Sequence, residues 1–353
     1  MYIAIYLCAL LCIVVIVICV YHATNARRNA HPNRLLKATK RFDALFEKCV
    51  ASNDCHLPSR IVRSLRRTIN LEAFSQACKK LNPDECRRIL LDNQQSIVDL
   101  QLRERSTIVH AYFAYLLRDL APFNGDEGAY GDLMLRFLDD DSVYARENAL
   151  RAIYSFGDAR LVESALTSLS NRGISHNQKL VSDGLLTFGG DEALLIELLM
   201  SHYDELLECY KNSLIDYLNH KGIDTYDERL IKDAKSGEAS LDTECAIIRK
   251  INKVPSERNL AFVEDVVERY QDGDDWEPVA VAVAGLRHYA KNAKVKELLK
   301  DKVTSRNWYI RKNAAASLAS IGLTRKDIDE IDAKDDRFAM DAIRYEQRRV
   351  SYA

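Results

Sequence analysis

Apolar and small residues recur along this chain in stretches that match one another. The clearest stretch, 304–322, can be laid over 144–157, and both read Tyr-x-Arg-x-Asn-Ala followed by aliphatic positions and a closing glycine. The closing glycines, Gly157 and Gly322, are 165 residues apart, which is five steps of 33. A period of this length is typical of helical hairpins that repeat along a solenoid. We therefore expect further copies between the two.

Weaker copies fall where this period places them. Two end near Gly189 and Gly222, and two more occupy 245–251 and 276–289. Leucine and isoleucine recur in them at spacings of three and four, which predicts one buried stripe on each helix. A single unit of this kind cannot bury its own apolar face, so the units must stack on one another. Small residues such as Ala149, Ala314 and Ala316 would let neighbouring helices approach closely.

These units resemble HEAT repeats, whose second helix carries an aspartate, then valine or isoleucine with arginine, then small and aliphatic residues. The stretch 141–150 matches that pattern, whereas 304–322 keeps Ile310 and Arg311 but has Ser305 or Asn307 where the aspartate belongs. The resemblance covers 123–325. It implies an all-α fold, a right-handed α-solenoid of HEAT-like helical hairpins.

The repeated polar positions have structural interpretations. The resemblance implies that Arg146 and Arg311 bond to acidic or carbonyl groups of the adjacent repeat. Asn148 and Asn313 are expected to bond to backbone groups between helices, because an unsatisfied buried amide costs about 1–3 kcal/mol. All four residues are therefore expected to stabilise the stack.

The N-terminal segment from Tyr2 to Tyr21 contains no charged residue, glycine or proline. About 20 apolar residues span the hydrocarbon core of a bilayer, so the sequence predicts a transmembrane helix at 1–22. A buried soluble helix and a cleaved signal peptide are the alternatives, the latter because small residues follow at 23–26. The basic residues from Arg27 to Arg41 predict a single-pass membrane protein with its N-terminus outside and its solenoid in the cytoplasm.

Charge is unevenly distributed along the chain. Residues 27–122 hold 18 Lys and Arg against 10 Asp and Glu, a net charge of +8, so the remainder carries −10. We interpret 23–41 as a basic juxtamembrane segment that contacts anionic headgroups, and 42–122 as an N-terminal helical region, also compatible with divergent repeats. The basic cluster at 60–67 lacks interleaved aromatic residues, so no nucleic-acid partner is expected. The charged segment 326–353 predicts a C-terminal capping helix after the repeats at 123–325.

Composition and motifs give no sign of catalysis. The 353 residues are 47% apolar and 29% charged with only 6 Pro, which favours a structured, helix-rich chain. The nine cysteines show no CxxC or metal-ligand spacing, as expected for reduced thiols. Nucleotide-binding, zinc-hydrolase and serine-hydrolase motifs are absent, and no histidine precedes a glutamate as in HEAT-like di-iron hydroxylases. We therefore expect no cofactor, no metal and no enzymatic activity.

The sequence thus predicts a membrane-anchored, non-catalytic HEAT-repeat scaffold or regulatory adaptor that binds a protein partner at the cytoplasmic membrane face. A membrane enzyme such as an envelope-polysaccharide glycosyltransferase is one candidate partner, because an anchor raises effective concentration. The alternative is a HEAT-type enzyme or ligand-binding protein, similar to a DNA glycosylase or a lyase. Second helices of HEAT repeats line the concave face, which makes these residues candidates for partner binding: Tyr144, Arg151, Lys179, Tyr210, Arg287, Trp308 and Lys312.

Overall fold

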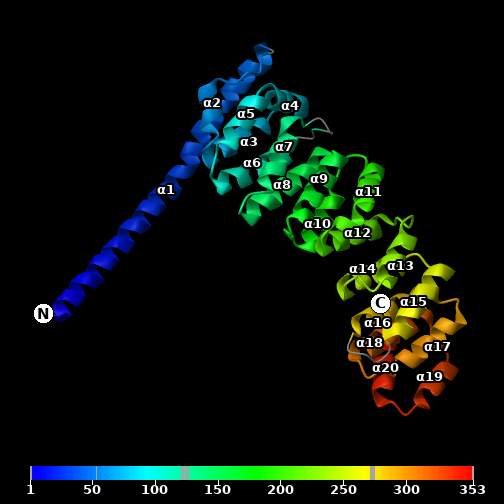
Figure 1. Ribbon diagram of the computed structural model, residues 1–353. Helices are drawn as coiled ribbons and strands as arrows, with labels where there is room; N and C mark the ends of the chain where they lie inside the picture. The colour runs from blue at the N-terminus through cyan, green and yellow to red at the C-terminus, as the bar shows by residue number, and fades with distance from the viewer. Residues whose placement is uncertain (1, 53, 121–122, 124–126, 271–274, 352–353) are drawn as a thin grey trace. The chain divides into compact units, whose positions relative to one another are not determined.

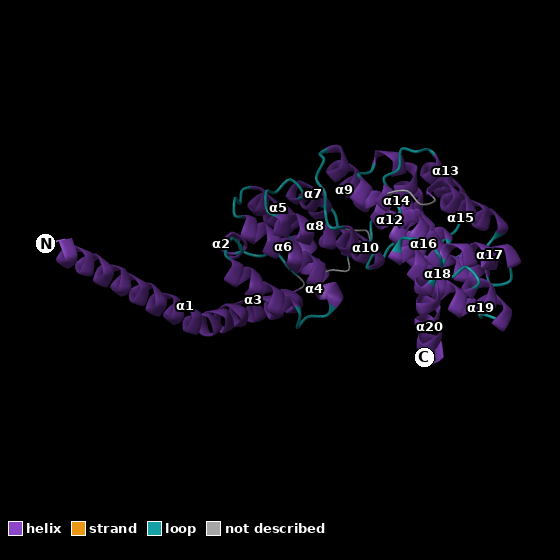
Figure 2. Ribbon diagram, turned by 90° about the horizontal axis from the view of Figure 1, so that it is seen from below, coloured by secondary structure: helices purple, strands orange, loops and turns teal. Residues whose placement is uncertain are grey.

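All regular elements in the described part of the chain are helices, as predicted. The computed structural model describes residues 2–52, 54–120, 123, 127–270 and 275–351 (Figure 1), with only the backbone described at 2–9, 22–29, 350 and 351. Figure 2 shows helices joined by short loops. The chain forms two compact units, and each is described here by itself.

The first unit comprises the described residues up to Arg172 together with Thr187–His202. Phe42 and Phe46 of its first helix pack edge-on against Phe74, with ring centroids 5.6 and 5.3 Å apart. The helix pairs α1–α3, α3–α6, α6–α8 and α9–α11 are in contact. Its helices are α1 (Tyr2–Ser52), α2 (Ser59–Ser64), α3 (Thr68–Cys78), α4 (Pro83–Asp92), α5 (Gln94–Leu102), α6 (Thr107–Leu120), α7 (Ala129–Phe137), α8 (Val143–Phe156), α9 (Ala159–Asn171) and α11 (Glu192–Ser201).

The second unit comprises Gly173–Leu186 and the described residues from Tyr203 onward. The even-numbered helices α10 to α20 form a row in which each packs on the next, while α13, α15, α17 and α19 each pack on the helix that follows them. Its helices are α10 (Gln178–Leu186), the short η1 (Tyr203–Glu205), α12 (Glu208–Lys221), α13 (Asp227–Lys235), α14 (Leu241–Ile251), α15 (Glu257–Tyr270), α16 (Glu277–Gly285), the short η2 (Leu286–Tyr289), α17 (Ala293–Lys302), α18 (Trp308–Ile321), α19 (Arg325–Asp332) and α20 (Arg337–Ser351).

This arrangement is repeat-like, and the matching stretches of sequence fall on equivalent helices. The copy at 144–157 lies on α8 of the first unit, while the five later copies lie on α10, α12, α14, α16 with η2, and α18. Successive copies in the second unit are therefore neighbours in its row. The predicted cap at 326–353 consists of two helices, α19 and α20, where the sequence predicted one.

The repeated arginines make the same contact in both copies. Arg146 Nη1 donates to the carbonyl of Asp140 at 2.6 Å, and Arg311 Nη1 donates to the carbonyl of Ser305 at 2.9 Å. Each carbonyl lies six residues earlier, in the loop that leads into the same helix. The guanidinium groups thus bond carbonyls, as expected, but of their own repeat. A charge-assisted bond to the entering loop fixes how each helix begins.

Polar side chains of α18 do connect neighbouring helices. Asn313 Nδ2 donates to the carbonyl of Ala280 at 2.8 Å, and Ser317 Oγ donates to the carbonyl of Val283 at 2.8 Å. Both acceptors belong to α16. The interface between α16 and α18 is therefore held by side chain-to-backbone bonds as well as by apolar packing.

Glycine ends three of the repeated helices for a conformational reason. Gly157, Gly222 and Gly322 have φ angles of 83°, 70° and 86°. These values lie in the left-handed region, which L-residues with a side chain rarely adopt. The recurring glycine in the sequence thus marks where each helix stops.

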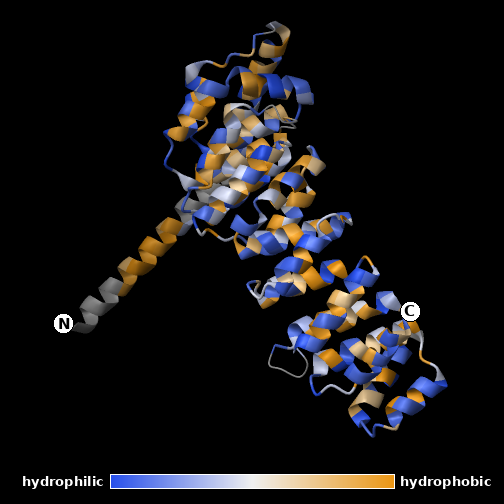
Figure 3. Ribbon diagram, turned by 45° about the vertical axis from the view of Figure 1, so that its right-hand side comes forward, coloured by the Kyte–Doolittle hydropathy of each residue, from blue (hydrophilic) through white to orange (hydrophobic). Residues whose placement is uncertain are grey.

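The prediction of a transmembrane helix and of a single-pass membrane location is wrong. In the part of the chain that the structure describes, no helix combines the length and the apolar character that a bilayer span requires. The side chains described in the first part of α1, Leu10 to Tyr21, are apolar (Figure 3). Beyond them α1 continues without a break to Ser52, and from residue 30 onward charged residues are interspersed with apolar ones. The side chains of 2–9 lie outside the described residues.

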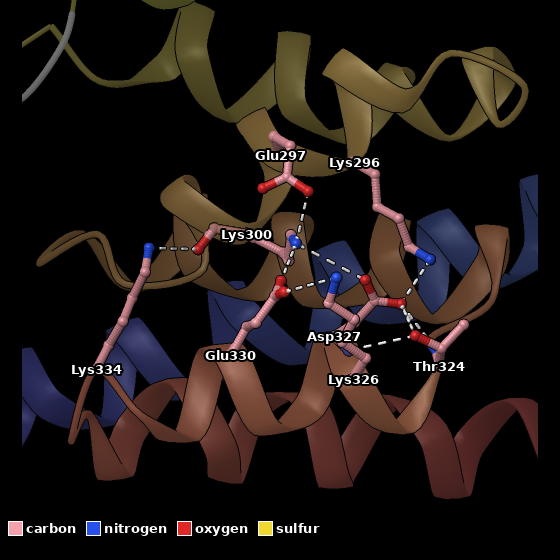
Figure 4. A network of polar contacts seen from close by, with 8 residues as sticks. All are labelled: Lys296, Glu297, Lys300, Thr324, Lys326, Asp327, Glu330 and Lys334. Carbon is pink, nitrogen blue, oxygen red and sulfur yellow. Dashed lines mark hydrogen bonds and ion pairs between the residues drawn. The ribbon is translucent and has the colours of Figure 1, made fainter.

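An ionic network joins α17 to α19 at the C-terminal end of the second unit (Figure 4). Lys300 is almost fully buried, and its Nζ lies 2.6 Å from Glu297 and 3.7 Å from Asp327. Glu330 also pairs with Lys300, and Lys296 Nζ lies 2.6 Å from Asp327. Burial alone would lower the pKa of Lys300, but Glu297 and Glu330 outweigh it and raise that pKa. The network thus links α17 to α19, which pack on α18 and α20 respectively.

Candidate functional site

A groove lies between α18 and α20 in the second unit. It encloses about 490 Å³. Its lining combines aromatic with charged side chains from both helices: Trp308, Arg311, Lys312, Phe338, Asp341, Ala342, Tyr345 and Glu346.

The first helical turn of α18 places the groove's tryptophan. Asn307 precedes the helix, and its side chain accepts hydrogen bonds from the backbone N–H groups of Tyr309 and Ile310 at 2.8 and 3.3 Å. This N-cap fixes the backbone from which Trp308 projects. Trp308 is 54% exposed, and the Nζ atom of Lys312, one turn later, lies 5.0 Å from its ring centroid. The ammonium group therefore covers one face of the indole.

The Tyr309 ring also contacts the tryptophan. Tyr309 stacks on Trp276 with centroids 4.6 Å apart and planes 8° apart, and it meets Trp308 edge-on at 4.9 Å. Aromatic pairs at these separations stabilise one another by about 0.5–1.5 kcal/mol. Trp276 and Trp308, which lie at the starts of α16 and α18, are thus linked through Tyr309.

The opposite wall of the groove comes from α20. The Asp336 side chain accepts from the backbone N–H of Phe338 at 2.9 Å and so caps this helix. Phe338 and Tyr345, seven residues apart, lie on one helical face and are 67% and 64% exposed. The guanidinium of Arg311 crosses from α18 and lies 5.3 Å from the Phe338 ring centroid. Three large aromatic side chains thus surround one groove while remaining open to solvent.

The acidic side chains in the groove differ in burial. Asp341 is exposed and lies 3.8 Å from Arg337 and 3.9 Å from Arg344. Glu346 is only 3% exposed, and Arg349 approaches one of its oxygens at 3.5 Å. The groove therefore has both signs of charge, with one carboxylate largely removed from water.

Of the residues predicted to bind a partner, the structure brings Trp308 and Lys312 together in this groove. Lys179 on α10 and Arg287 in η2 are exposed elsewhere in the second unit, and Lys179 pairs with Asp183 at 3.2 Å. Tyr210 is fully buried, and its hydroxyl donates to the carbonyl of Ile174 at 2.7 Å.

The other two predicted residues lie on α8 of the first unit. Tyr144 is 78% exposed at the start of that helix. Arg151 is half-buried and donates to Glu147 at 2.9 Å. Tyr144 therefore presents an aromatic surface to solvent, whereas Arg151 is engaged within its own helix.

Sequence reasoning missed the part of the groove that α20 contributes. It assigned to the charged segment 326–353 only the role of a capping helix. Within α20, Ile343 is buried while Phe338 and Tyr345 are exposed. The seven-residue spacing of the two aromatic residues was the available signal, since i and i+7 share a face.

A second, polar pocket of about 350 Å³ lies between α13, α14 and α15. Glu244 in its wall accepts from Arg269 Nη1 at 3.1 Å and from the Tyr270 hydroxyl. Burial raises the pKa of Glu244, and burial together with this carboxylate raises the pKa of Tyr270 to about 12. Glu244, Arg269 and Tyr270 thus satisfy one another's hydrogen-bonding groups, and we interpret this pocket as a structural network.

The described residues contain no group of three or more His, Cys, Asp or Glu side chains that could hold a metal ion. Comparison of the chain with known protein families, with curated proteins and with solved structures finds no match.

Proposed function

We propose that this chain is a non-catalytic scaffold or regulatory adaptor, built as a HEAT-like α-solenoid, which binds a protein partner through the groove between α18 and α20. One observation carries the proposal: Trp308, Phe338 and Tyr345 are each more than half exposed and surround the same groove. Exposed clusters of large apolar side chains usually mark interaction sites. Tryptophan, tyrosine and arginine are also the residue types most often found as interface hot spots.

The HEAT-like part of the proposal rests on the repeated features. Copies about 33 residues apart lie on successive helices of the second unit's row, and Arg146 and Arg311 make equivalent bonds to the loops before their helices. Stacked helical hairpins offer extended surfaces that are typically used to bind proteins. Tyr144 on α8 is a further exposed aromatic residue for such contacts.

Partner retrieval with the full-length chain tests this function. We expect the wild-type chain to retrieve one stoichiometric protein, and Trp308→Ala with Tyr345→Ala to abolish that retrieval, because each hot-spot truncation costs about 2 kcal/mol or more. Ile108→Ala, at a 69% exposed position on α6, is the matched control and should retain the partner. An unchanged yield with the double variant, at an unchanged melting temperature, would disprove the proposal.

A further inference from the structure

Glu346 is a buried carboxylate with an unused acceptor. It lines the groove and is 3% exposed, yet its Oε1 has no hydrogen-bond partner among the residues that the structure describes. Its Oε2 meets only the Arg349 guanidinium at 3.5 Å, and the Arg349 side chain is 67% exposed. A carboxylate oxygen held away from water without a donor is unfavourable. A ligand that supplies the donor would remove that penalty.

The other charged groups of the groove already have contacts. Arg311 donates to the Ser305 carbonyl and lies over Phe338, and Lys312 lies over Trp308. Asp341 has Arg337 and Arg344 within 4 Å. Glu346 differs from them in keeping one oxygen, Oε1, without a donor, since Arg349 meets only its Oε2. A donor that also carries positive charge would suit this carboxylate.

The aromatic walls define the shape of that cation. Tyr345 is 64% exposed and has no aromatic or cation–π partner among the described side chains, and Glu346 is the next residue on α20. Ala342, one turn earlier, is small and leaves room between Phe338 and Tyr345. An aliphatic stem can pack in this space while a planar charged head stacks on the tyrosine and donates to the carboxylate.

We infer that the groove accepts an arginine side chain of the protein partner, with its guanidinium on Glu346 Oε1 and Tyr345 and its stem between Phe338 and Trp308. Arginine fits better than lysine because its planar fork combines carboxylate binding with aromatic stacking. This inference rests on the proposed function and names the chemistry of the residue that the partner inserts.

Binding of synthetic peptides by calorimetry tests it on the full-length chain. The probes are short blocked alanine–leucine peptides that differ only at a central position, which is arginine, citrulline or glutamate. Citrulline keeps the shape of arginine without the charge. We expect the arginine peptide to bind at least tenfold more tightly than the citrulline peptide, and the glutamate peptide to bind more weakly still.

Two variants locate the effect. Glu346→Gln should weaken the arginine peptide at least tenfold and leave the citrulline peptide unchanged, with a melting temperature equal to or above that of the wild type. Glu257→Gln, at an exposed position of α15, should change neither affinity.

Several results would overturn the inference. One is equal affinity of the wild-type chain for the arginine and citrulline peptides, and another is tighter binding of the glutamate peptide than of the arginine peptide. A third is that arginine with blocked termini, not part of a peptide, binds as tightly as the arginine peptide, which would indicate a site for small cations. If any of them occurs while partner retrieval still depends on Trp308 and Tyr345, the arginine assignment fails and the protein-binding function stands. The comparison of the three peptides on the wild-type chain does not depend on the folding of any variant.

Discussion

Asp327 shows how one ionised residue can tie two helices together. Its carboxylate lies 2.6 Å from Lys296 Nζ on α17 and accepts from the Thr324 backbone N–H at 2.7 Å and from the Thr324 hydroxyl at 2.6 Å. Burial would raise the pKa of this carboxyl, but the bonds from Lys296 and Thr324 outweigh burial and hold its pKa well below the ordinary value. The ionised form is therefore the one that the fold favours.

This shift predicts a pH-dependent contribution to stability. Because the folded-state pKa is depressed, the contribution is complete above the unfolded pKa of about 3.9 and is lost as pH falls below it toward the folded value. Asp327→Asn should lower the free energy of unfolding by about 1–3 kcal/mol at pH 7. The difference from wild type should shrink between about pH 4 and pH 2. Thermal melts across this range measure it, with Asp329→Asn, an exposed position on the same helix, as control; a difference that is constant with pH would contradict the assignment.

Tyr210 shows that residue type alone does not determine whether a side chain is exposed or buried. The sequence predicted a helix around Tyr210, and that helix is present as α12. Tyr210 was proposed as a partner contact because tyrosine is common in interfaces. The structure turns it inward, where its hydroxyl satisfies the Ile174 carbonyl. Adjacent positions on a helix point about 100° apart. An error of one position in the predicted face therefore moves a side chain from the surface to the core.

Among the elements, α16 and α18 show most clearly how the small residues of the repeat pattern affect helix packing. Ala314 is completely buried in α18 beside Asn313, whose side chain bonds to the Ala280 carbonyl of α16. Small residues and direct bonds to backbone imply that these two helices are closely packed.

Ala314→Leu should therefore destabilise the second unit. Overpacking a filled helix interface costs about 1–3 kcal/mol, and urea unfolding followed by circular dichroism would measure it. Ala319→Leu, on the same helix at a partly exposed position, should cost less. Equal midpoints for wild type and Ala314→Leu would mean that α16 and α18 are not packed as described.

Helix α20 illustrates the limit of prediction at this scale. A charged helix with few apolar residues was expected from the composition of 326–353, and the helix is present. The spacing of Phe338 and Tyr345 indicated a shared face, but their position beside α18 could not be predicted, because it involves Arg311 reaching from α18 to Phe338. Periodicity within one helix carries no information about the side chains that meet it from a neighbour.

For the whole molecule, the repeat period was the informative feature of the sequence. It predicted an all-helical chain and the places of the repeated helices, because stacking imposes the same small, aliphatic and glycine positions on every unit. The apolar N-terminal segment led to a wrong prediction of a membrane span, since the described part of the chain contains no helix with both the length and the apolar character that a span requires.

The central claim, that the groove between α18 and α20 binds a protein, is tested most directly by site-specific photo-cross-linking in cells. A photoreactive phenylalanine analogue is placed at Tyr345, which is 64% exposed in the groove, and in a separate chain at Lys326, whose side chain is 85% exposed on α19. We predict a covalent adduct with one protein species at position 345 and none at position 326. No adduct at position 345, or the same adducts at both positions, would contradict the account.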